Sequence, residues 1–511
     1  MDDIADEAGP RRVINRASIA AAGALYQQSA SFASGLIVAR VIGAADYGIF
    51  TLARSLIEVA GIATRLGLDI GLQRFFGETH AACDGSSVVV VLRQVRLLAA
   101  AFALVPVVAI ALGLGKVLET NVYHYPWFAH ILLCLALALP FVTDLGVLGG
   151  AYRGILKLSP SVLAECVLLP TIRLAFIVIL FVAGWRLWAV VAGTTLGSIV
   201  AAAFLALRAR SDFRGGARSE SKSWTAAFGV MRYSSILAVA VLVTTLTATI
   251  DTLMLGRFAP ARELGQYSLV KALLVPMGVF GAAFSEGLGR LVAERHFQGD
   301  TRGMVHAMSL TARWGTLTTL PILAVFLFWG AQLTPLFGAS FAVPQAVIVW
   351  LAAGQFAIAV LSRCGWALSM TGRHLLELKI LSAGLLIAVL LCSIAVPAYG
   401  QLGAAVATCV SVAITNVARL LFVRRALGAF PFERDLLVII VAGIALAWAS
   451  SMASSVVIAG LHLSSFWNTS CGVACFLVAY GIAAWTGLLN EVERNGIRHA
   501  LRNTRRAAFG P

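Results

Sequence analysis

The sequence predicts an all-α polytopic membrane protein with about fourteen transmembrane helices, arranged as two six-helix bundles and a C-terminal helix pair. Three observations support this fold class. The 511-residue chain is 59% hydrophobic and only 12% charged, with a mean hydropathy of +0.88, whereas a soluble domain has about twice that charged fraction. Apolar runs of about 20 residues, enough to cross a bilayer, recur from end to end. The chain also repeats a motif at a spacing of 217 residues, as in the pair Arg40 and Arg257.

The apolar runs are too long and too evenly apolar for barrel strands, and lipid offers the backbone no hydrogen-bond partners, so we predict helices. The predicted spans are 17–40, 49–70, 88–113, 127–149, 161–182, 187–207, 228–256, 266–289, 307–330, 343–369, 376–396, 401–423, 436–460 and 466–488. The chain starts with a polar, acidic segment, unlike a cleavable signal, so the first span is expected to stay in the mature protein.

The net charge of +15 follows the predicted topology. Under the fourteen-span assignment, 26 Arg and Lys residues fall on one side of the membrane and 5 on the other. The smaller group is Arg40, Lys116, Arg186, Arg257 and Arg262. The positive-inside rule places the larger group and both termini in the cytoplasm. The basic charge then reflects topology and attraction to anionic lipid headgroups, and no nucleic-acid partner is expected.

Motifs for catalysis or metal binding are not found in the sequence. The eight cysteines and eight histidines form no close-spaced ligand set, and there is no Walker loop or nucleophile elbow. We therefore expect no metal site, no cofactor and no catalytic residue, and predict that the protein is not an enzyme.

The repeat is clearest where "ARVIGAADYGIFTLARS" (39–55) matches "GRFAPARELGQYSLVKA" (256–272) without a gap. Matched pairs include Arg40 with Arg257, Asp46 with Glu263, Gly48 with Gly265, Thr51 with Ser268 and Arg54 with Lys271. Gly154 corresponds to Gly372 and Gly184 to Gly400, at offsets of 218 and 216. These landmarks predict a duplicated unit. Because each unit holds an even number of spans, the units are related by a pseudo-two-fold axis along the membrane normal.

The repeat sets the predicted domain organisation. The segments are a cytoplasmic N-terminal segment (1–16), an N-terminal six-helix bundle (17–207), a basic cytoplasmic linker (208–227), a C-terminal six-helix bundle (228–423), an extra helix pair (424–488) and a basic cytoplasmic tail (489–511).

The repeated loop has a simple structural interpretation. Its glycines, Gly48 and Gly265, are expected before the incoming helix, where a tight turn tolerates positive φ. Asp46 and Glu263 lie near the N-terminus of that helix, where a carboxylate complements the helix dipole. A well-capped outer hairpin, made twice, would explain these four residues without a functional role.

Charged residues inside the spans are the functional candidates. In span 49–70, Arg54, Glu58, Arg65 and Asp69 fall on one helical stripe, as the i,i+4 pairs Arg54–Glu58 and Arg65–Asp69. A lone charge at the bilayer centre costs roughly 3 kcal/mol, so deep cations should face a wet cavity or pair internally. Cationic cavity candidates are Arg54, Arg65, Arg173, Lys271 and Arg363, whereas Arg232, Arg313 and Arg419 lie near inner ends and can snorkel. Coupling or ion-pair candidates are Glu58, Asp69 and Asp251, the last of which either titrates during transport or pairs with a neighbouring cation.

Three stretches carry a family resemblance. "LIVARVIGAADYGIFTLARSLIEVAGIATRLGLDIGLQRFFGE", "TIDTLMLGRFAPARELGQYSLVKALL" and "PAYGQLGAAVATCVS" resemble the polysaccharide transporter family of the multidrug/oligosaccharidyl-lipid/polysaccharide (MOP) exporter superfamily, over about residues 17 to 425. The resemblance implies two bundles around a central cavity and alternating access. The implied substrate is a polyprenyl-diphosphate-linked oligosaccharide, a repeat unit of O-antigen (lipopolysaccharide), exopolysaccharide or capsule. It also implies a bacterial inner-membrane location, contacts with membrane lipids, and a polysaccharide polymerase and chain-length regulator as partners. The last two spans resemble the extra pair of lipid II flippases.

This substrate agrees with the cations in the spans, because fixed guanidinium and ammonium groups offset the desolvation of a diphosphate. Three alternatives stay open. A multidrug exporter of the same superfamily would favour acidic cavity residues. A polyprenyl-dependent polymerase or ligase would favour a large outer loop. A non-transporting scaffold of a polysaccharide assembly machine is the third.

Overall fold

The computed structural model describes residues 10–81, 85–155, 157–213, 224–427, 430, 432, 435–459, 465–489 and 493–495. Within these ranges the regular secondary structure is helical and contains no strand. Ten helices of this part are long and apolar enough to cross a membrane. The all-α, multi-pass class predicted from the sequence is confirmed.

The ten helices account for most of the fourteen predicted spans. The spans 376–396 and 401–423 fall within a single helix of this set, at His374–Ala426. Three predicted spans lie in helices that are not among the ten. Span 17–40 lies in α2 (Pro10–Ile42), span 49–70 in α3 (Ala44–Arg65) and α4 (Leu68–Ala81), and span 266–289 in α13 (Ala261–Phe297). The described residues of every predicted span are therefore mainly helical, although one run of helix contains two of the spans.

The chain forms two compact units by its internal contacts. Unit 1 comprises the described parts of Met1–Leu273 and Leu381–Ala407, and unit 2 those of Leu274–Ile380 and Thr408–Pro511. Two long helices, α13 and α17 (His374–Leu427), contribute to both units. This division follows packing, not sequence repetition, and the two six-helix bundles at 17–207 and 228–423 stay a prediction.

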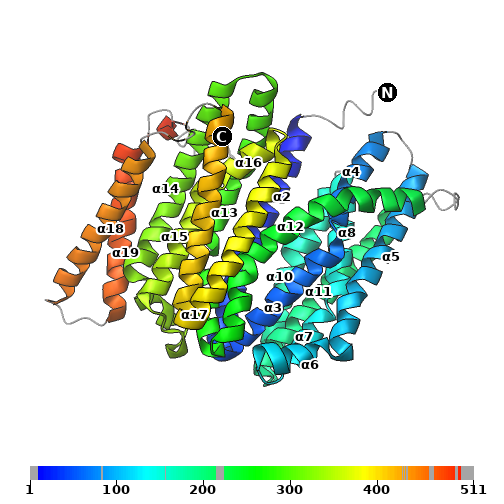
Figure 1. Ribbon diagram of the computed structural model, residues 1–511, viewed down its shortest axis with the longest axis horizontal. Coiled ribbons are helices and arrows are strands. Elements are labelled where there is room, and N and C mark those ends of the chain that lie inside the picture. Colours follow the sequence, from blue (N-terminus) through cyan, green and yellow to red (C-terminus); the bar gives the residue numbers. More distant parts are fainter. Residues whose placement is uncertain are drawn as a thin grey trace, which may run out of the picture. The chain divides into compact units, whose positions relative to one another are not determined.

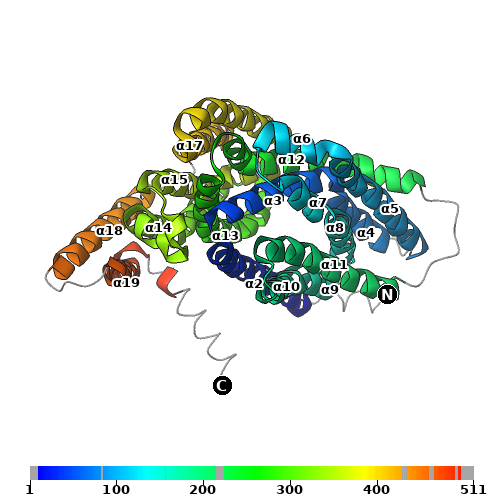
Figure 2. The same cartoon turned by 90° about the horizontal axis from the view of Figure 1, so that it is seen from below.

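Unit 1 contains α2 to α12, the first part of α13 and the middle of α17 (Figure 1). Besides α2, α3 and α4, its helices are α5 (Gly85–Ala109), η1 (Ile110–Leu114), α6 (Gly115–Val117), η2 (Leu118–Tyr123), α7 (Phe128–Ala136), α8 (Leu139–Gly154), α9 (Leu158–Val162), η3 (Leu163–Leu168), α10 (Leu169–Val182), α11 (Arg186–Asp212) and α12 (Trp224–Phe258). The helix α10 packs along α11, and α2 packs on α9, η3 and α10 (Figure 2). The helix α12 packs on α3 and α4.

Small residues permit α10 and α11 to approach each other closely in unit 1. A Cβ at Gly193 would lie 2.9 Å from the backbone nitrogen of Ile177, and one at Gly197 would lie 2.8 Å from the Cα of Arg173. Gly193 and Gly197 of α11 thus permit its close packing against α10. A fully buried apolar cluster joins α4, α5 and α8, and its members include Leu72, Phe76, Val95, Leu148 and Tyr152.

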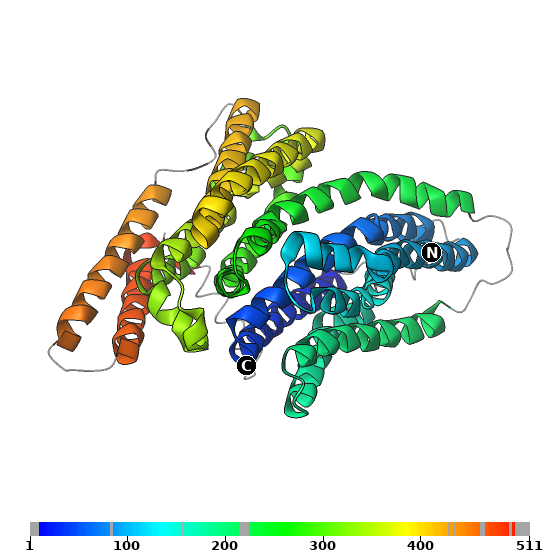
Figure 3. The ribbon, with the colours of Figure 1, turned by 60° about the horizontal axis from the view of Figure 1, so that its bottom comes forward.

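Unit 2 contains the remainder of α13 and the two ends of α17. Its other helices are α14 (Thr301–Leu333), η4 (Thr334–Phe337), η5 (Ala339–Phe341), α15 (Gln345–Leu361), α16 (Arg363–Met370), α18 (Asp435–Ala459), α19 (Ser465–Ala483) and η6 (Ala484–Leu488). The helices α18 and α19 run side by side, orange and red in Figure 3, and both pack on α14. The hydroxyl of Tyr480 donates a 2.9 Å hydrogen bond to the carbonyl of Leu317, which ties the extra helix pair to α14.

Three breaks in the helices fall at residues with positive φ. Leu66 (φ 48°) and Gly67 (φ 65°) divide the predicted span 49–70 into α3 and α4. Gly184 (φ 91°) separates α10 from α11, and Gly400 (φ 55°) interrupts α17. Gly184 and Gly400 are matched positions of the sequence repeat, so both copies use a glycine where an L side chain would be strained.

Candidate functional site

The two copies of the repeated motif contact each other within unit 1. Gly48 lies in the first turns of α3, and a Cβ there would lie 2.7 Å from the backbone nitrogen of Gly265 and would overlap the carbonyl oxygen of Ala261. In turn, a Cβ at Gly265 would overlap the carbonyl oxygen of Ala44. The contact is reciprocal, because Ala44 and Ala261 are themselves matched positions of the repeat, as in an isologous interface.

A hydrogen bond completes this crossing of α3 and α13. The hydroxyl of Thr51 donates to that of Ser268 over 3.0 Å, and these two residues are 217 positions apart. The expected role of Gly48 and Gly265 in a positive-φ turn is wrong, since both lie inside helices. The turn before α3 uses Gly43 (φ 82°) instead. The matched glycines, Gly48 and Gly265, serve close helix approach.

The carboxylates of the motif occupy the expected positions. Asp46 lies in the first turn of α3 and Glu263 in the first turn of α13, where each complements the helix dipole. Arg40 and Arg257 lie in the last turns of α2 and α12. Arg257 donates a 2.6 Å hydrogen bond to the carbonyl of Val122.

Lys271 lies one turn beyond Ser268 on α13 and forms an ion pair with Asp251 of α12. Its Nζ lies 2.8 Å and 2.9 Å from the two carboxylate oxygens of Asp251 and 2.9 Å from the carbonyl of Ala248. The hydroxyl of Tyr267 donates to the same carboxylate over 2.6 Å. Asp251 is 1% exposed, whereas the Lys271 side chain is 31% exposed. Of the two alternatives for Asp251, the structure therefore contains the ion pair, and Lys271 keeps one side accessible.

Arg54, the counterpart of Lys271 in the repeat, has a different environment. Its side chain is exposed on α3, and it forms no ion pair with Glu58 or any other described residue. The expected Arg54–Glu58 pair is therefore absent from this part of the chain. Arg173 of α10 lies within electrostatic range of Arg54 and likewise has no ion-pair partner among the described residues. Unit 1 thus contains two guanidinium groups that interact electrostatically and have no ion-pair partner among the described residues.

The expected pair Arg65–Asp69 does not form, because the helix ends at Arg65 and Asp69 belongs to α4. The i,i+4 geometry needs a continuous helix, and Leu66 and Gly67 interrupt it. The guanidinium of Arg65 instead lies on Gly146 of α8, where a Cβ would come within 3.3 Å of it.

Glu165 of η3 interacts electrostatically with Arg65 and Asp69, and its ion pair with Arg153 of α8 measures 3.1 Å. The Nε of Arg65 is buried without a hydrogen-bond partner. Glu165 and Arg153 were not candidates from the sequence. The sequence signal for Glu165 was an acidic residue inside a predicted span. The same signal applied to Asp144, whose carboxylate accepts two hydrogen bonds of 2.6 Å and 2.8 Å from Arg96.

In unit 2 the candidate Arg363 is fully buried, with 0% exposure. Its Nη1 donates to the carbonyls of Ala359 and Val360 in its own chain segment, and its Nε and Nη2 have no hydrogen-bond partner. The guanidinium packs against Gly315, where any Cβ would overlap it. In this conformation Arg363 does not line an open cavity.

Two arginines of unit 2 that were expected to snorkel are paired instead. Arg419 of α17 forms an ion pair with Glu377, and Arg313 of α14 lies 3.3 Å from the carboxylate of Glu493. The snorkelling interpretation is wrong for Arg313 and Arg419, whose side chains are 9% and 13% exposed. The partner carboxylates lie far away in sequence, so local spacing does not reveal them.

Comparison with solved structures identifies the fold. An inward-facing multidrug resistance MATE family transporter of the MOP superfamily matches with a TM-score of 0.67 at 13% identity, covering 82% of this chain and 98% of its own. The lipid II flippase MurJ, in an inward closed conformation, matches with a TM-score of 0.67 at 12% identity, covering 91% and 98%. A MOP superfamily transporter from Pyrococcus furiosus, described as having a binding pocket of reversed polarity, matches with a TM-score of 0.58 at 14% identity, covering 84% and 98%. The fold is that of a MOP superfamily transporter.

Comparison of sequences defines the family. The profile of the polysaccharide biosynthesis protein family matches residues 14–285, more than half of the chain, and the MatE profile matches residues 237–394. No curated protein matches the chain in sequence. The chain therefore belongs to the polysaccharide biosynthesis protein family within the MOP exporter superfamily.

Proposed function

We propose that this protein flips a polyprenyl-diphosphate-linked oligosaccharide, a repeat unit of a surface polysaccharide, across the bacterial inner membrane. The observation that carries the proposal is the pair Arg54 and Arg173 in unit 1. Two like charges that are held close together without a carboxylate repel each other, and the repulsion is strong where the effective dielectric constant is low. A diphosphate supplies the missing negative charge and accepts bidentate hydrogen bonds from guanidinium groups.

Lys271 supports the same substrate in a different way. Its ammonium is held by the buried Asp251 but is about one-third exposed. A diphosphate that approached Lys271 would share this cation with Asp251. The proposed head-group site therefore combines free guanidinium charge on α3 and α10 with a positioned ammonium on α13.

Alternating access supplies a mechanical role for the repeated motif. The predicted topology places the crossing of α3 and α13 at the outer end of these helices. For a head group to leave outward, the contacts at Gly48, Gly265 and the Thr51–Ser268 hydrogen bond must separate. A Thr51→Cys, Ser268→Cys double variant, in a background without other cysteines, should lose transport on oxidation and regain it with a reductant. Loss of transport in either single variant under the same oxidation would contradict this gate.

The test of the substrate is a flipping assay with purified protein in vesicles. A fluorescent polyprenyl-diphosphate oligosaccharide is placed in one leaflet, and its appearance in the other is followed with an impermeant quencher. Arg54→Ala and Arg173→Ala should each weaken head-group binding about ten- to a hundredfold, the effect of losing one charge-assisted hydrogen bond of roughly 1.5–3 kcal/mol. Arg232→Ala removes an exposed charge of α12 and serves as the matched control.

The outcomes separate the alternatives. Efflux of a cationic dye without flipping of the lipid-linked sugar would favour a multidrug exporter. Elongation or transfer of the sugar would favour a polymerase or ligase, and inactivity in every assay would favour a scaffold. Normal flipping by an Arg54→Ala, Arg173→Ala double variant would reject these residues as the diphosphate site while keeping the substrate.

A further inference from the structure

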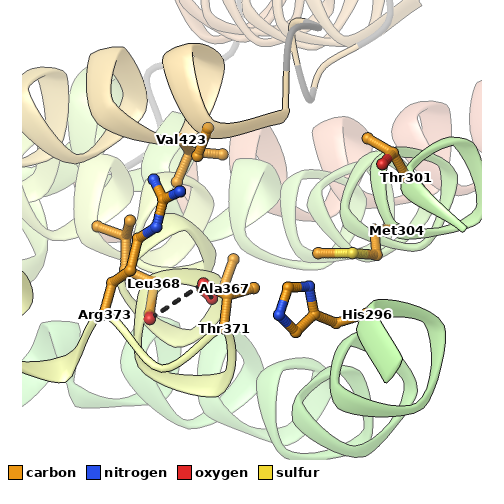
Figure 4. Close-up of a pocket in the computed structure, with 9 residues that line it drawn as sticks. His296, Thr301, Met304, Ala367, Leu368, Thr371, Arg373 and Val423 are labelled. Atoms are coloured by element: carbon orange, nitrogen blue, oxygen red, sulfur yellow. Dashed lines mark hydrogen bonds between the residues drawn. The ribbon is translucent and has the colours of Figure 1, made fainter. Parts of the chain in front are cut away.

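Unit 2 contains a small pocket of about 160 Å³ between the end of α13, the start of α14, the turn between α16 and α17 and the last turns of α17 (Figure 4). Its apolar part is lined by Met304, Leu368 and Val423, which are 2%, 1% and 2% exposed. Pockets for drug-sized ligands usually measure about 300–1,000 Å³. A pocket of this size accepts a small group, and an oligosaccharide is too large for it.

The polar lining of the pocket has unused hydrogen-bonding capacity. The side chains of His296, Thr301 and Arg373 all line the pocket and make no hydrogen bond or ion pair with any residue that the structure describes. Figure 4 shows the His296 ring and the Arg373 side chain on different sides of the hollow. Thr371 differs, because its hydroxyl donates to the carbonyl of Ala367 over 2.8 Å. The three exposed side chains of His296, Thr301 and Arg373 therefore offer hydrogen-bond donors at the rim of the pocket, without an acceptor among the described residues.

The local charge favours an anion at this site. Asp300, next to Thr301 in the chain, already accepts hydrogen bonds from the Arg295 guanidinium and the Gly303 amide, each of 2.8 Å. Its negative charge is thereby offset by Arg295, and Arg373 stays without a carboxylate partner in the described residues. A phosphate group fits this set of donors, because arginine binds phosphate oxygens in a planar, bidentate geometry.

The surroundings favour a lipid as the source of the phosphate. Phe297, the neighbour of His296, is 93% exposed, and Leu375 near Arg373 is 60% exposed. Exposed apolar side chains beside cationic groups are typical of a membrane interface. The distribution of Arg and Lys predicts that this end of unit 2 faces the cytoplasm, where the leaflet carries anionic lipids.

We propose that this pocket binds the phosphate group of an anionic phospholipid. Arg373 binds the phosphate oxygens, His296 and Thr301 add hydrogen bonds, and the glycerol carbons lie over Met304, Leu368 and Val423. This lipid is separate from the flipped substrate, so the proposal does not depend on the proposed function.

The experiment measures thermal unfolding of the full purified chain in a neutral detergent. The added probes are phosphatidylglycerol, phosphatidylcholine, glycerol 3-phosphate and inorganic phosphate. Phosphatidylglycerol should raise the unfolding temperature of the wild-type protein in a saturable way, and the other three should not. In Arg373→Gln the apparent affinity for phosphatidylglycerol should fall about tenfold or more, as expected for loss of a charge-assisted hydrogen bond. Arg373→Lys should show a smaller loss, because it keeps the charge but not the bidentate geometry.

The control is Arg302→Gln, which makes the same change of charge in the first turn of α14 at an exposed residue outside the pocket. Its response to phosphatidylglycerol should equal that of the wild-type protein. Equal losses in Arg302→Gln and Arg373→Gln would mean diffuse surface attraction and would overturn the site. A saturable response to inorganic phosphate would overturn the lipid as its source. If Arg373→Gln does not fold, His296→Gln tests the same pocket and should weaken the lipid response.

Discussion

Replacing Lys271 by methionine should destabilise the protein by about 3 kcal/mol, because it leaves the buried carboxylate of Asp251 without its cation. Removing one partner of a buried ion pair costs about 3–5 kcal/mol. The Lys271 side chain is 31% exposed, so part of its charge is solvated and the lower end of that range applies. Asp251 would keep hydrogen bonds of 2.6 Å each from the Tyr267 hydroxyl and the Thr252 amide, which also limits the loss. Methionine preserves most of the side-chain volume, so the change reports on charge and not on a cavity.

The assay is denaturant-induced unfolding of the purified protein in one fixed detergent, analysed as a double-mutant cycle. Lys271→Met and Asp251→Asn are compared singly and together. The double variant should recover to within about 1 kcal/mol of the wild-type protein, because a neutral pair leaves no buried charge unpaired. A loss below about 1 kcal/mol in Lys271→Met, or additive losses in the double variant, would refute the structural role of this ion pair. Lys271→Arg keeps the charge and serves as the conservative control.

Three further predictions concern packing, a buried charge and a helix cap. Gly265→Val should destabilise the protein by about 1–3 kcal/mol or abolish folding, because its side chain would overlap the backbone of α3. Gly35→Val, where no atom lies within 4 Å of the added Cβ, should cost less than about 1 kcal/mol, and equal losses would contradict the packing argument. Arg363→Met should raise the free energy of unfolding by about 1–4 kcal/mol, because a hydrophobic residue replaces a buried charge with two unpaired donors. A decrease in the free energy of unfolding would show that the guanidinium is compensated by a bound anion. The Gly303 amide, together with Arg295, holds the pKa of Asp300 below its usual value of 3.8. The Asp300 carboxylate therefore stabilises the start of α14 fully above pH 3.8, and this stabilisation is lost as the pH falls through the lowered pKa. Hydrogen exchange at Gly303 should therefore speed up below pH 3.8 relative to Asp300→Asn, and the same pH dependence in both proteins would contradict it.

The charged residues show why local spacing alone gave only part of the candidate site. Arg65 and Asp69 have the correct spacing for an ion pair, but the positive φ of Leu66 and Gly67 ends the helix between them. A single helical wheel cannot anticipate that break, because leucine rarely adopts positive φ. Arg313 pairs instead with Glu493, which lies far along the chain. Such partners become neighbours only through tertiary packing.

The glycines of the repeat show a similar limit. The matched spacing correctly identified Gly48 and Gly265 as equivalent positions, but it suggested a turn. Both residues are helical, and each lies against the backbone of the other copy of the motif. A glycine in a sequence is consistent with positive φ and with close approach, and only the contact decides between them.

The sequence by itself determined the all-α, multi-pass class and located most of the helical spans, because hydropathy and helix length are properties of consecutive residues. It also contains the matched motifs from which the duplicated unit is predicted. Tertiary structure alone decided which cations are neutralised. It placed Lys271 on Asp251, left Arg54 exposed without an ion-pair partner among the described residues and enclosed Arg363 completely. The physical reason is that the free energy of a charge in a membrane protein depends on its nearest dipoles and counter-charges, and residues distant in sequence supply these only after the helices have packed.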